Sequence, residues 1–338
     1  MLELESAVME GDVEFIKDYV RRDVCDSLAI ESAFSTALLQ KNIDILRAFY
    51  DESSRRLFRF LWIAIEQGHP YAVRELITAG ADTKWLNQNT TPLHLATKHG
   101  HIGVVRVLLE FGCDIMARNI YNATALHVAA ELNRIDIIEE LIKRGIDTSA
   151  RNRNIGTALH IAAEQGHVDA VRILARAEVS FSNNDEGISV QDDVGVMARN
   201  RHRATPLHLA AENGHAETIR ALLLAGSQVN AVNAIGDTAL RFACAKSSVL
   251  SVQELIAAGA DVEILNNRGR SAMDVTNCTT IKAMLTAEMK WKRRKEFMVF
   301  LYSAGFYGQV EQCNTKRHST LVKVFENLDL CREICQYL

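Results

Sequence analysis

Hydrophobic positions in this chain form short helical runs that come in pairs, and each pair is followed by a polar stretch. In one unit, Val104, Val107 and Leu108 fall at the spacing of one helix face, and Gly112 ends the run. Residues 114–123, DIMARNIYNA, are too polar and too short for a further helix, so we expect a projecting hairpin, called a finger below. The pattern therefore predicts a unit of two helices and one finger.

The unit repeats along the chain with a fixed period. The phrase TPLHLA returns as TALHVA, TALHIA, TPLHLA, TALRFA and SAMDVT. The copies begin at Thr91, Thr124, Thr157, Thr205, Thr238 and Ser271. They lie 33 residues apart, except that 48 residues, 15 more than the period, separate Thr157 from Thr205. A constant period of this length indicates an array of stacked units and not one compact core.

Residue chemistry explains how each phrase starts and ends a helix. Pro92 and Pro206 stand in a first helical turn, where a backbone N–H has no partner, and the preceding threonine hydroxyl can accept from the N–H groups that remain. Gly100, Gly166 and Gly214 can end the helix, because glycine adopts the left-handed conformation readily. One unit cannot bury its own apolar face, so the units must stack on their neighbours.

The phrase, the period, the central Gly-His pair and the second apolar helix together resemble the ankyrin repeat. The resemblance implies an all-α solenoid of about nine helix-turn-helix units with hairpin fingers, plus a short helical C-terminal segment. We expect residues 1–56 to be degenerate N-terminal repeats that act as a cap. Residues 57–278 form the array, with a finger insertion near 182–196, and residues 279–338 form a degenerate last repeat and a basic helical tail.

Composition is typical of an intracellular protein. The 338 residues are 24% charged and 48% hydrophobic with a net charge of −4, which excludes a disordered chain and binding to polyanions through bulk charge. The N-terminus is acidic and lacks a secretory signal, and no run approaches the ~18 apolar residues of a membrane span. The seven cysteines are scattered, as expected of reduced thiols. We expect a monomer in the cytoplasm or the nucleus, with no membrane partner.

Candidate catalytic and metal-binding residues are few. Eight of the eleven histidines occupy the TPLH phrase or the Gly-His pair, and in ankyrin proteins the TPLH histidine links neighbouring loops by hydrogen bonds. In the tail, Cys331 and Cys335 with His318 supply too few ligands for a tetrahedral zinc site. The sequence has no phosphate loop, nucleotide fingerprint or nucleophile elbow. We therefore expect no enzyme activity, no cofactor and no metal.

The resemblance places partner binding on the concave surface formed by the fingers and the inner helices. Three neighbouring fingers carry six arginines together with a tyrosine and an isoleucine. The candidate contacts are Trp85, Arg118, Ile120, Tyr121, Arg151, Arg153, Asn154, Arg199, Arg201, His202 and Ile235. Arginine pairs bidentately with carboxylates and phosphates, so these fingers predict a basic stripe for an acidic or phosphorylated protein segment. Ordinary solvated loops are the alternative.

The 15 extra residues are predicted to lengthen one finger. RAEVSFSNNDEG, from Arg176, reads as one finger approach, and VGVMARNRHRA, from Val194, reads as a second. The segment carries the acidic residues Asp185, Glu186, Asp192 and Asp193. It is either a loop that covers the basic stripe until a partner binds or a surface insertion without a role.

The chain beyond Thr279 is basic and breaks the period. Residues 290–295, KWKRRK, suit a nuclear import signal, a nucleic-acid patch or a solvated helix face. The last stretch resembles the F-box-like segments at the C-termini of some ankyrin proteins, which engage a cullin-type ubiquitin ligase. Leu330, Ile334 and Leu338 echo that pattern, although its proline is missing, and a cap helix is the alternative.

Three functions follow from these features. The first is a protein–protein interaction scaffold or adaptor that uses the concave finger face. The second is a substrate-recognition adaptor of a cullin-type ubiquitin ligase. The third is a nucleic-acid-associated regulatory protein, with nucleic acid the least expected of the partners.

Overall fold

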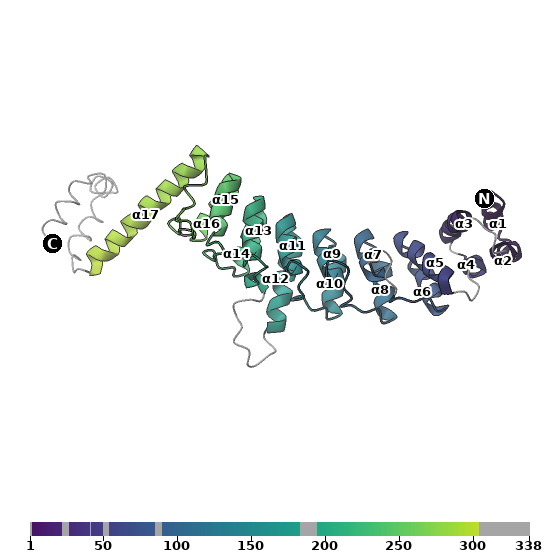
Figure 1. Cartoon of the computed structure of the whole chain (residues 1–338). Coiled ribbons are helices and arrows are strands. Elements are labelled where there is room, and N and C mark those ends of the chain that lie inside the picture. The colour runs from purple at the N-terminus through teal and green to yellow at the C-terminus, as the bar shows by residue number, and fades with distance from the viewer. Residues whose placement is uncertain are drawn as a thin grey trace, which may run out of the picture.

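The computed structural model describes residues 2–21, 27–40, 42–49, 54–84, 90–182 and 195–303. Helices in this part of the chain stack side by side in an elongated row, with the N-terminal helices at one end and the last helix at the other (Figure 1). Within these ranges, β-structure is limited to isolated bridge residues such as Val232 and Thr238. The prediction of an all-α solenoid is confirmed.

Five central units each contribute one inner and one outer helix. The inner helices are α7 (Pro92–His99), α9 (Ala125–Glu131), α11 (Ala158–Gln165), α13 (Pro206–Asn213) and α15 (Ala239–Lys246). The outer helices are α8 (Ile102–Glu110), α10 (Ile135–Lys143), α12 (Val168–Ser182), α14 (Ala216–Leu224) and α16 (Val249–Ala257). Each helix packs against its partner within the unit and against the helix of the same row in the next unit, which gives two rows (Figure 1).

Three helix pairs precede these units. They are α1 (Leu2–Glu10) with α2 (Val13–Arg21), α3 (Ser27–Gln40) with α4 (Ile43–Phe49), and α5 (Ser54–Glu66) with α6 (Pro70–Thr78). Their sequences lack the TPLH phrase, and their junction is filled by aromatic rings instead. Phe34 stacks on Phe60 with ring centroids 4.2 Å apart and meets Phe49 edge-on at 5.6 Å. Because α5 also packs against α7, the apolar core continues into the central units.

The predicted helix signals act as expected. Thr91 has an extended backbone, and its Oγ1 accepts a hydrogen bond from the backbone N–H of His94 at 3.4 Å. Gly100, Gly166 and Gly214 follow their inner helices in the left-handed conformation, with φ of 80°, 77° and 77°. These glycines let the chain turn at once into the outer helix.

Small side chains bring neighbouring inner helices close together. The alanine that ends the phrase and the alanine that follows it are buried, as in Ala129 and Ala130 of α9 or Ala162 and Ala163 of α11. The leucine of each phrase, such as Leu126, is also buried between units. Inner helices therefore pack through alanine and leucine, which leaves their exposed faces and the fingers to carry the variable residues.

The insertion differs from the sequence prediction at its start. Residues from Arg176 were expected to approach a finger, but α12 continues to Ser182 and has 15 residues, against nine in α8, α10, α14 and α16. The other outer helices are followed by a left-handed glycine, for example Gly145 with φ of 81° and Gly226 with φ of 94°. The residue at that place of the period after α12 is Glu178, so the stop signal is missing and the helix runs on.

The last phrase also differs from its predecessors. SAMDVT at Ser271 forms turns instead of an inner helix, and the chain next enters α17 (Thr279–Ser303), a 25-residue helix. Ile281 and Leu285 of α17 are buried at the end of the array. A short 3-10 turn, η1 (Gly195–Met197), precedes the third central finger and packs against α12 and α13.

Candidate functional site

The histidine of each TPLH phrase ties one unit to the next finger. His94, His127, His160 and His208 bring Nε2 within 2.8–3.1 Å of the carbonyl oxygens of Ala123, Gly156, Ala204 and Asp237. In α9, the backbone N–H of Thr124 donates to Nδ1 of His127 at 3.2 Å, so the ring proton must sit on Nε2, where it is donated onward. The predicted structural role of these histidines is confirmed.

Burial favours the neutral form of three of these imidazoles, His94, His127 and His208. Desolvation lowers the pKa of His127 and of His208 from 6.5 to about 4, although the hydrogen bond to the carbonyl opposes the shift, and burial also lowers the pKa of His94. The Gly-His histidines make the reverse connection, since Nε2 of His101 and of His167 lies 3.0 Å from a carbonyl oxygen of the preceding unit. Both sets are occupied by structural bonds.

In five of the described fingers, one asparagine holds the tip. Oδ1 of Asn119 accepts hydrogen bonds from the backbone N–H of Tyr121 at 2.9 Å and of Ala123 at 3.1 Å. The same pair of bonds recurs at Asn152, Asn200, Asn233 and Asn266. Such a turn fixes the backbone with a short side chain, and it leaves the residues between the bonds pointing away from the array. This asparagine was missed at the sequence level, although it recurs on the 33-residue period.

Backbone hydrogen bonds then set neighbouring tips in register. The N–H of Arg153 donates to the carbonyl of Tyr121 at 2.9 Å, and that of Arg201 donates to the carbonyl of Asn154 at 3.2 Å. Ala234 and Asn267 continue the series at the next two fingers, with donations to His202 and Ile235. We call the resulting line of tips the finger edge, which comprises residues 119–122, 152–155, 200–203, 233–236 and 266–269.

Three of the predicted arginines brace this edge from behind. Arg118 Nη1 donates to the carbonyls of Asn122 at 2.9 Å and Arg151 at 2.7 Å. Arg151 Nη1 donates in turn to the carbonyl of Arg199 at 2.6 Å, and Arg199 Nη1 donates to that of Val232 at 2.9 Å. The five predicted arginines do lie on adjacent fingers, but these three are committed to the backbone. Their structural role could not be read from residue type alone.

The outermost positions of the tips are exposed. Tyr121 is 62% exposed, and Ile120 and Ile235 are each 51% exposed. Four further tip residues are exposed: Arg153, Asn154, Arg201 and His202. Arg201 Nη2 donates a hydrogen bond to the carbonyl of Arg153 at 3.2 Å. The structure thus brings the predicted tip residues together along one edge.

One tip residue, Ile155, was not among the sequence candidates, whereas Arg203 is the sixth of the arginines noted on the fingers. Ile155 and Arg203 are exposed and have φ of 61° and 56°, a left-handed conformation that Gly236 and Gly269 occupy at the same place in later fingers. This conformation is unfavourable for a β-branched residue such as isoleucine. An exposed isoleucine held in a strained conformation is a reason to include Ile155 in the site.

The inner helices add a second strip beside the finger edge. Val128, Ile161, Leu209 and Phe242 occupy the fifth place of the phrase and are half-buried. Three places later stand Glu131, Glu164 and Glu212, which are exposed near the far ends of α9, α11 and α13. On the concave side, the basic residues of the finger tips are therefore followed by the apolar strip of the inner helices and then by the row of glutamates.

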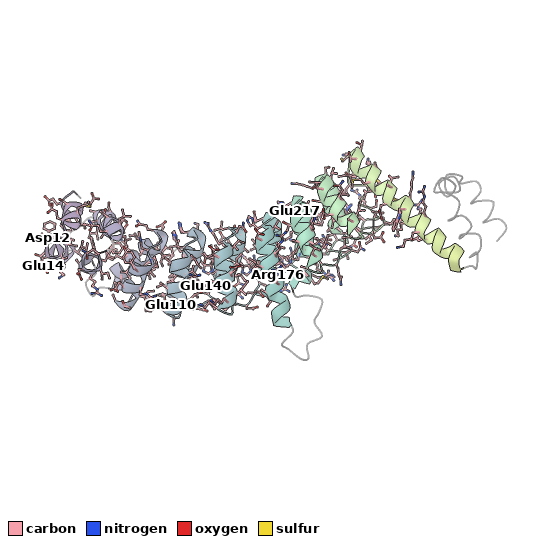
Figure 2. The ribbon with its side chains drawn as sticks, turned by 180° about the vertical axis from the view of Figure 1, so that it is seen from behind. Asp12, Glu14, Glu110, Glu140, Arg176 and Glu217 are labelled. Atoms are coloured by element: carbon pink, nitrogen blue, oxygen red, sulfur yellow. The ribbon has the colours of Figure 1, made fainter. Side chains whose placement is uncertain are left out.

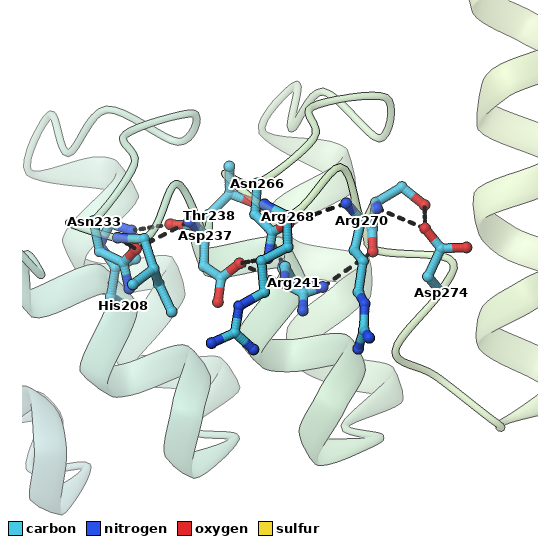
Figure 3. Close-up of polar contacts among 11 residues, drawn as sticks. His208, Asn233, Asp237, Thr238, Arg241, Asn266, Arg268, Arg270 and Asp274 are labelled. Atoms are coloured by element: carbon cyan, nitrogen blue, oxygen red, sulfur yellow. Dashed lines mark hydrogen bonds and ion pairs between the residues drawn. The ribbon is translucent and has the colours of Figure 1, made fainter.

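The network changes at the last finger. TALRFA has arginine in place of histidine, and Arg241 forms an ion pair with Asp237 and donates from Nη1 to the carbonyl of Ser271 at 3.3 Å (Figure 3). Asn266 Nδ2 donates to the same Asp237 carboxylate at 2.9 Å, and Asp274 accepts from the backbone N–H of Ser271 at 2.7 Å. An ion pair thus replaces the imidazole where the regular array ends.

Several sequence candidates lie outside the described residues. They are Trp85, the inserted residues 183–194, and Leu330, Ile334 and Leu338 of the tail. Among the residues the structure describes, no cluster of histidine, cysteine and carboxylate side chains could hold a metal ion. None of the helices in the same ranges has the length and apolar character required to cross a membrane.

Comparison with known proteins agrees with this geometry. Over 59 residues the chain is 41% identical to Ankyrin repeat and SOCS box protein 5 of Bos taurus, and that match spans 18% of each protein. A crystal structure of the human ASB11 ankyrin repeat domain superimposes with a TM-score of 0.55 over 68% of this chain and 96% of that one, at 24% identity. The ankyrin repeat domain of Bcl-3, described as a unique member of the IkappaB protein family, gives a TM-score of 0.56 over 67% and 97%, at 28% identity.

The family model described as ankyrin repeats (3 copies) matches residues 61–152, 121–185, 146–233 and 187–266, which together span more than half of the chain. Ankyrin repeats generally mediate protein–protein interactions. The period, the buried histidine network, the fingers and these matches have one explanation: the chain belongs to the ankyrin repeat family.

Proposed function

We propose that the protein is an interaction scaffold that binds an acidic segment of a partner protein along its finger edge. The observation that carries the proposal is the register of the tips, because one backbone hydrogen bond per unit aligns exposed side chains of consecutive fingers. Tyr121 and Ile120 offer rigid apolar area at one end of the edge, which is the kind of contact that dominates many interfaces.

Charge favours an acidic or phosphorylated segment on this edge. Arg153 is exposed at one tip, and Arg201 and Arg203 are exposed at the next. The tip residues of these two fingers include no carboxylate. Arginine binds carboxylates and phosphates in a planar, bidentate manner. The guanidinium groups of Arg118, Arg151 and Arg199 add positive charge behind the tips while they hold the backbone.

The carboxylates of the inner helices orient the partner. Glu131, Glu164 and Glu212 lie seven residues beyond the threonine of each phrase, which is roughly 10 Å along a helix. A bound segment therefore keeps its acidic groups toward the fingers and its apolar groups toward Val128, Ile161 and Leu209. Basic groups on its other side can meet the glutamates.

A charge-reversal experiment tests this surface. The variant Arg153→Glu with Arg201→Glu is compared with the native chain in affinity purification from a cell extract, followed by quantitative mass spectrometry. We expect the native partners to be lost while the melting temperature stays within a few degrees, because both side chains are exposed. Lys143→Glu with Lys282→Glu, two exposed lysines away from the tips, is the matched control. An unchanged partner list in the arginine variant would exclude the finger edge.

A second candidate function is substrate recognition for a cullin-type ubiquitin ligase. It is favoured by the name of the bovine relative, which contains a SOCS box, and by the F-box-like pattern of Leu330, Ile334 and Leu338. In this case the array selects the partner, and the tail recruits the ligase. Truncation after Thr315 keeps the whole of α17 and separates the two roles of the tail. Loss of cullin components with an unchanged melting temperature supports the adaptor, whereas a lowered melting temperature with unchanged partners supports a cap.

Nucleic-acid binding has less support. In KWKRRK, Lys292 Nζ lies 3.1 Å from Asp261 and 3.0 Å from Glu263, and the ammonium of Lys295 lies 5.2 Å from the ring centroid of Trp291. The ion pairs of Lys292 fasten α17 to the preceding loop and neutralise part of the charge, whereas the Lys295 contact lies within α17. This function would be supported if the chain bound an oligonucleotide with an affinity that falls steeply as salt is added.

A further inference from the structure

Two of the four junctions between the outer helices α8, α10, α12, α14 and α16 carry an arginine–glutamate pair. Arg106 Nε of α8 lies 3.1 Å from Glu140 of α10, and Arg220 Nη2 of α14 lies 2.6 Å from Glu254 of α16. The two pairs occupy the same places of the repeat, since each arginine is followed by its glutamate 34 residues later. We call this series the outer ladder.

The outer ladder is missing at the other two junctions. Between α10 and α12 both places differ, with Glu139 and Ile173, whereas between α12 and α14 only the glutamate is missing. Arg172 occupies the arginine place of α12, but the glutamate place on α14 is taken by Ala221. Arg172 instead makes an ion pair with Asp169 of its own helix at 3.5 Å, with both side chains more than half exposed. An exposed pair of this kind contributes little, so Arg172 can exchange it for another carboxylate at small cost.

An open groove lies between α12 and α14. Its volume is about 350 Å³, and it is lined by Arg172, Ala175, Arg176, Ala221, Leu224 and Ala225. The alanines form a shallow apolar floor, and the two arginines stand one helical turn apart on α12. Figure 2 shows Arg176 on the same side of the array as Glu110 and Glu140 of the preceding outer helices.

Leu224 gives the groove an apolar rim. It is 84% exposed, the largest exposed fraction among the large hydrophobic side chains of the described residues. The same place of the repeat holds Glu110 in α8, Lys143 in α10 and Arg176 in α12. Helix α14 therefore carries a leucine where α8, α10 and α12 carry a charged residue, and its glutamate place, which is filled in α10 and α16, holds an alanine.

We propose that this groove is a second protein-binding site, which takes an amphipathic helix of a partner that packs an apolar side chain on Leu224 and gives a carboxylate to Arg172. Alanines on the floor allow a helix to lie close between α12 and α14, as ridges of one helix fit grooves between others. The partner carboxylate pairs with Arg172 in the way that Glu140 pairs with Arg106 and Glu254 with Arg220. The site lies on the outer helices, so its occupant does not compete with a segment on the finger edge.

Selection of peptides from a defined library tests the proposal. A phage library of random 16-residue peptides is selected on the full chain and counter-selected on Leu224→Glu. We expect enrichment of peptides in which leucine or phenylalanine stands three or four places from aspartate or glutamate. The best peptide is then synthesised with a fluorescent label, and its affinity is measured by anisotropy. It should lose at least ten-fold in affinity for both Leu224→Glu and Arg172→Glu.

Matched variants separate this site from the finger edge and from general stickiness. Leu250→Glu changes a 65% exposed leucine on the next outer helix, and it should leave the affinity within two-fold, as should Arg153→Glu with Arg201→Glu. A peptide with lysine in place of its acidic residue should regain binding to Arg172→Glu. If Leu224→Glu lowers the melting temperature, Leu224→Ala replaces it. The proposal is overturned if no peptide distinguishes native chain from the Leu224 variant, if enriched peptides lack acidic residues, or if the finger-edge variant abolishes binding.

Discussion

The inner and outer rows of helices are joined by different chemistry. At four successive inner junctions a buried neutral histidine donates to a carbonyl of the next finger, with almost no variation in geometry. The outer ladder uses ion pairs whose arginines are about half exposed, although the Glu140 side chain is buried, and the pair is present at only two of the four outer junctions. A buried polar group must keep its partner, whereas an exposed ion pair can be lost for less than about 1 kcal/mol. The inner row therefore preserves the fold, and the outer row is free to acquire new surfaces.

Acidification should have the largest effect on the free energy of unfolding, and it should distinguish the histidines of the inner row from the ion pairs of the outer row. The pKa of His127 and of His208 falls from 6.5 to about 4 on folding, so the unfolded chain binds more protons than the folded chain in this interval. The free energy of unfolding should fall as the pH is lowered from about 6.5 to 4, by about 1.4 kcal/mol per histidine for each pH step of one. Urea unfolding followed by circular dichroism between pH 8 and pH 3.5 measures the loss.

The outer ladder should respond in a lower range of pH. Burial alone would raise the pKa of Glu140, but Arg106 and Arg144 outweigh it, and the pKa of the carboxyl is lower than its ordinary 4.5. The Arg220 guanidinium lowers the pKa of Glu254 in the same direction. These carboxylates lose their contribution only as the pH falls below 4.5. Constant stability between pH 6.5 and 4.5 would contradict a histidine-based inner row.

Removal of one inner histidine should have the next largest effect. His127→Ala leaves the Thr124 N–H and the Gly156 carbonyl without their partner and opens a small cavity, so we expect a loss of about 3 kcal/mol in the free energy of unfolding. His101→Ala removes a more exposed connection to Glu66 and should cost about 1 kcal/mol. Equal losses would mean that burial does not distinguish the two sets of histidines. Hydrogen exchange at the finger of residues 151–156 would localise the change.

The substitution Ile155→Gly should stabilise the array and also weaken partner binding at the finger edge. The left-handed backbone of Ile155 costs about 1 kcal/mol relative to glycine, and Gly236 shows that glycine fits this place of a finger. Ile155→Gly should therefore raise the free energy of unfolding by up to that amount, less the entropy that glycine adds to the unfolded chain. Arg203→Gly is the matched control for backbone strain at a neighbouring tip. A loss of stability in Ile155→Gly would show that the side chain is packed and not offered to a partner.

Repair of the outer ladder should have the smallest effect. Ala221→Glu places a carboxylate beside Arg172 and should add no more than about 0.5 kcal/mol, a gain that disappears in Arg172→Ala and at 1 M salt. A double-mutant cycle from urea unfolding measures the coupling. The same variant should block the groove, since its carboxylate occupies the place proposed for the partner. A coupling near zero would mean that Arg172 cannot reach residue 221.

The sequence predicted the parts of the molecule that repeat. The period located the inner helices, the left-handed glycines and the structural histidines, because each is required by local geometry in every unit. The extension of α12 was also within reach, since Glu178 stands at a place where the period demands glycine. It was missed because the insertion was interpreted only as a lengthened finger.

The sequence could not predict which arginines bind the finger backbone and which are exposed. Arg151 and Arg153 are two residues apart on one finger, but the first reaches the carbonyl of Arg199 and the second projects into solvent. Which carbonyl lies within reach depends on how successive fingers are spaced, and residue type does not report this spacing. The inner-helix strip with Ile161 was missed for a related reason, since half-burial depends on the curvature of the row.

The asparagine turns of the fingers also bear on how such a protein can change over generations. Because Asn119 and its equivalents hold the backbone through their own side chains, the residues between them contribute little to folding. Isoleucine, arginine and alanine already occupy one such place in four consecutive fingers, at Ile120, Arg153, Arg201 and Ala234. Substitutions there alter what the surface recognises with little penalty in stability. New specificities can thus arise one residue at a time on a backbone that selection leaves untouched.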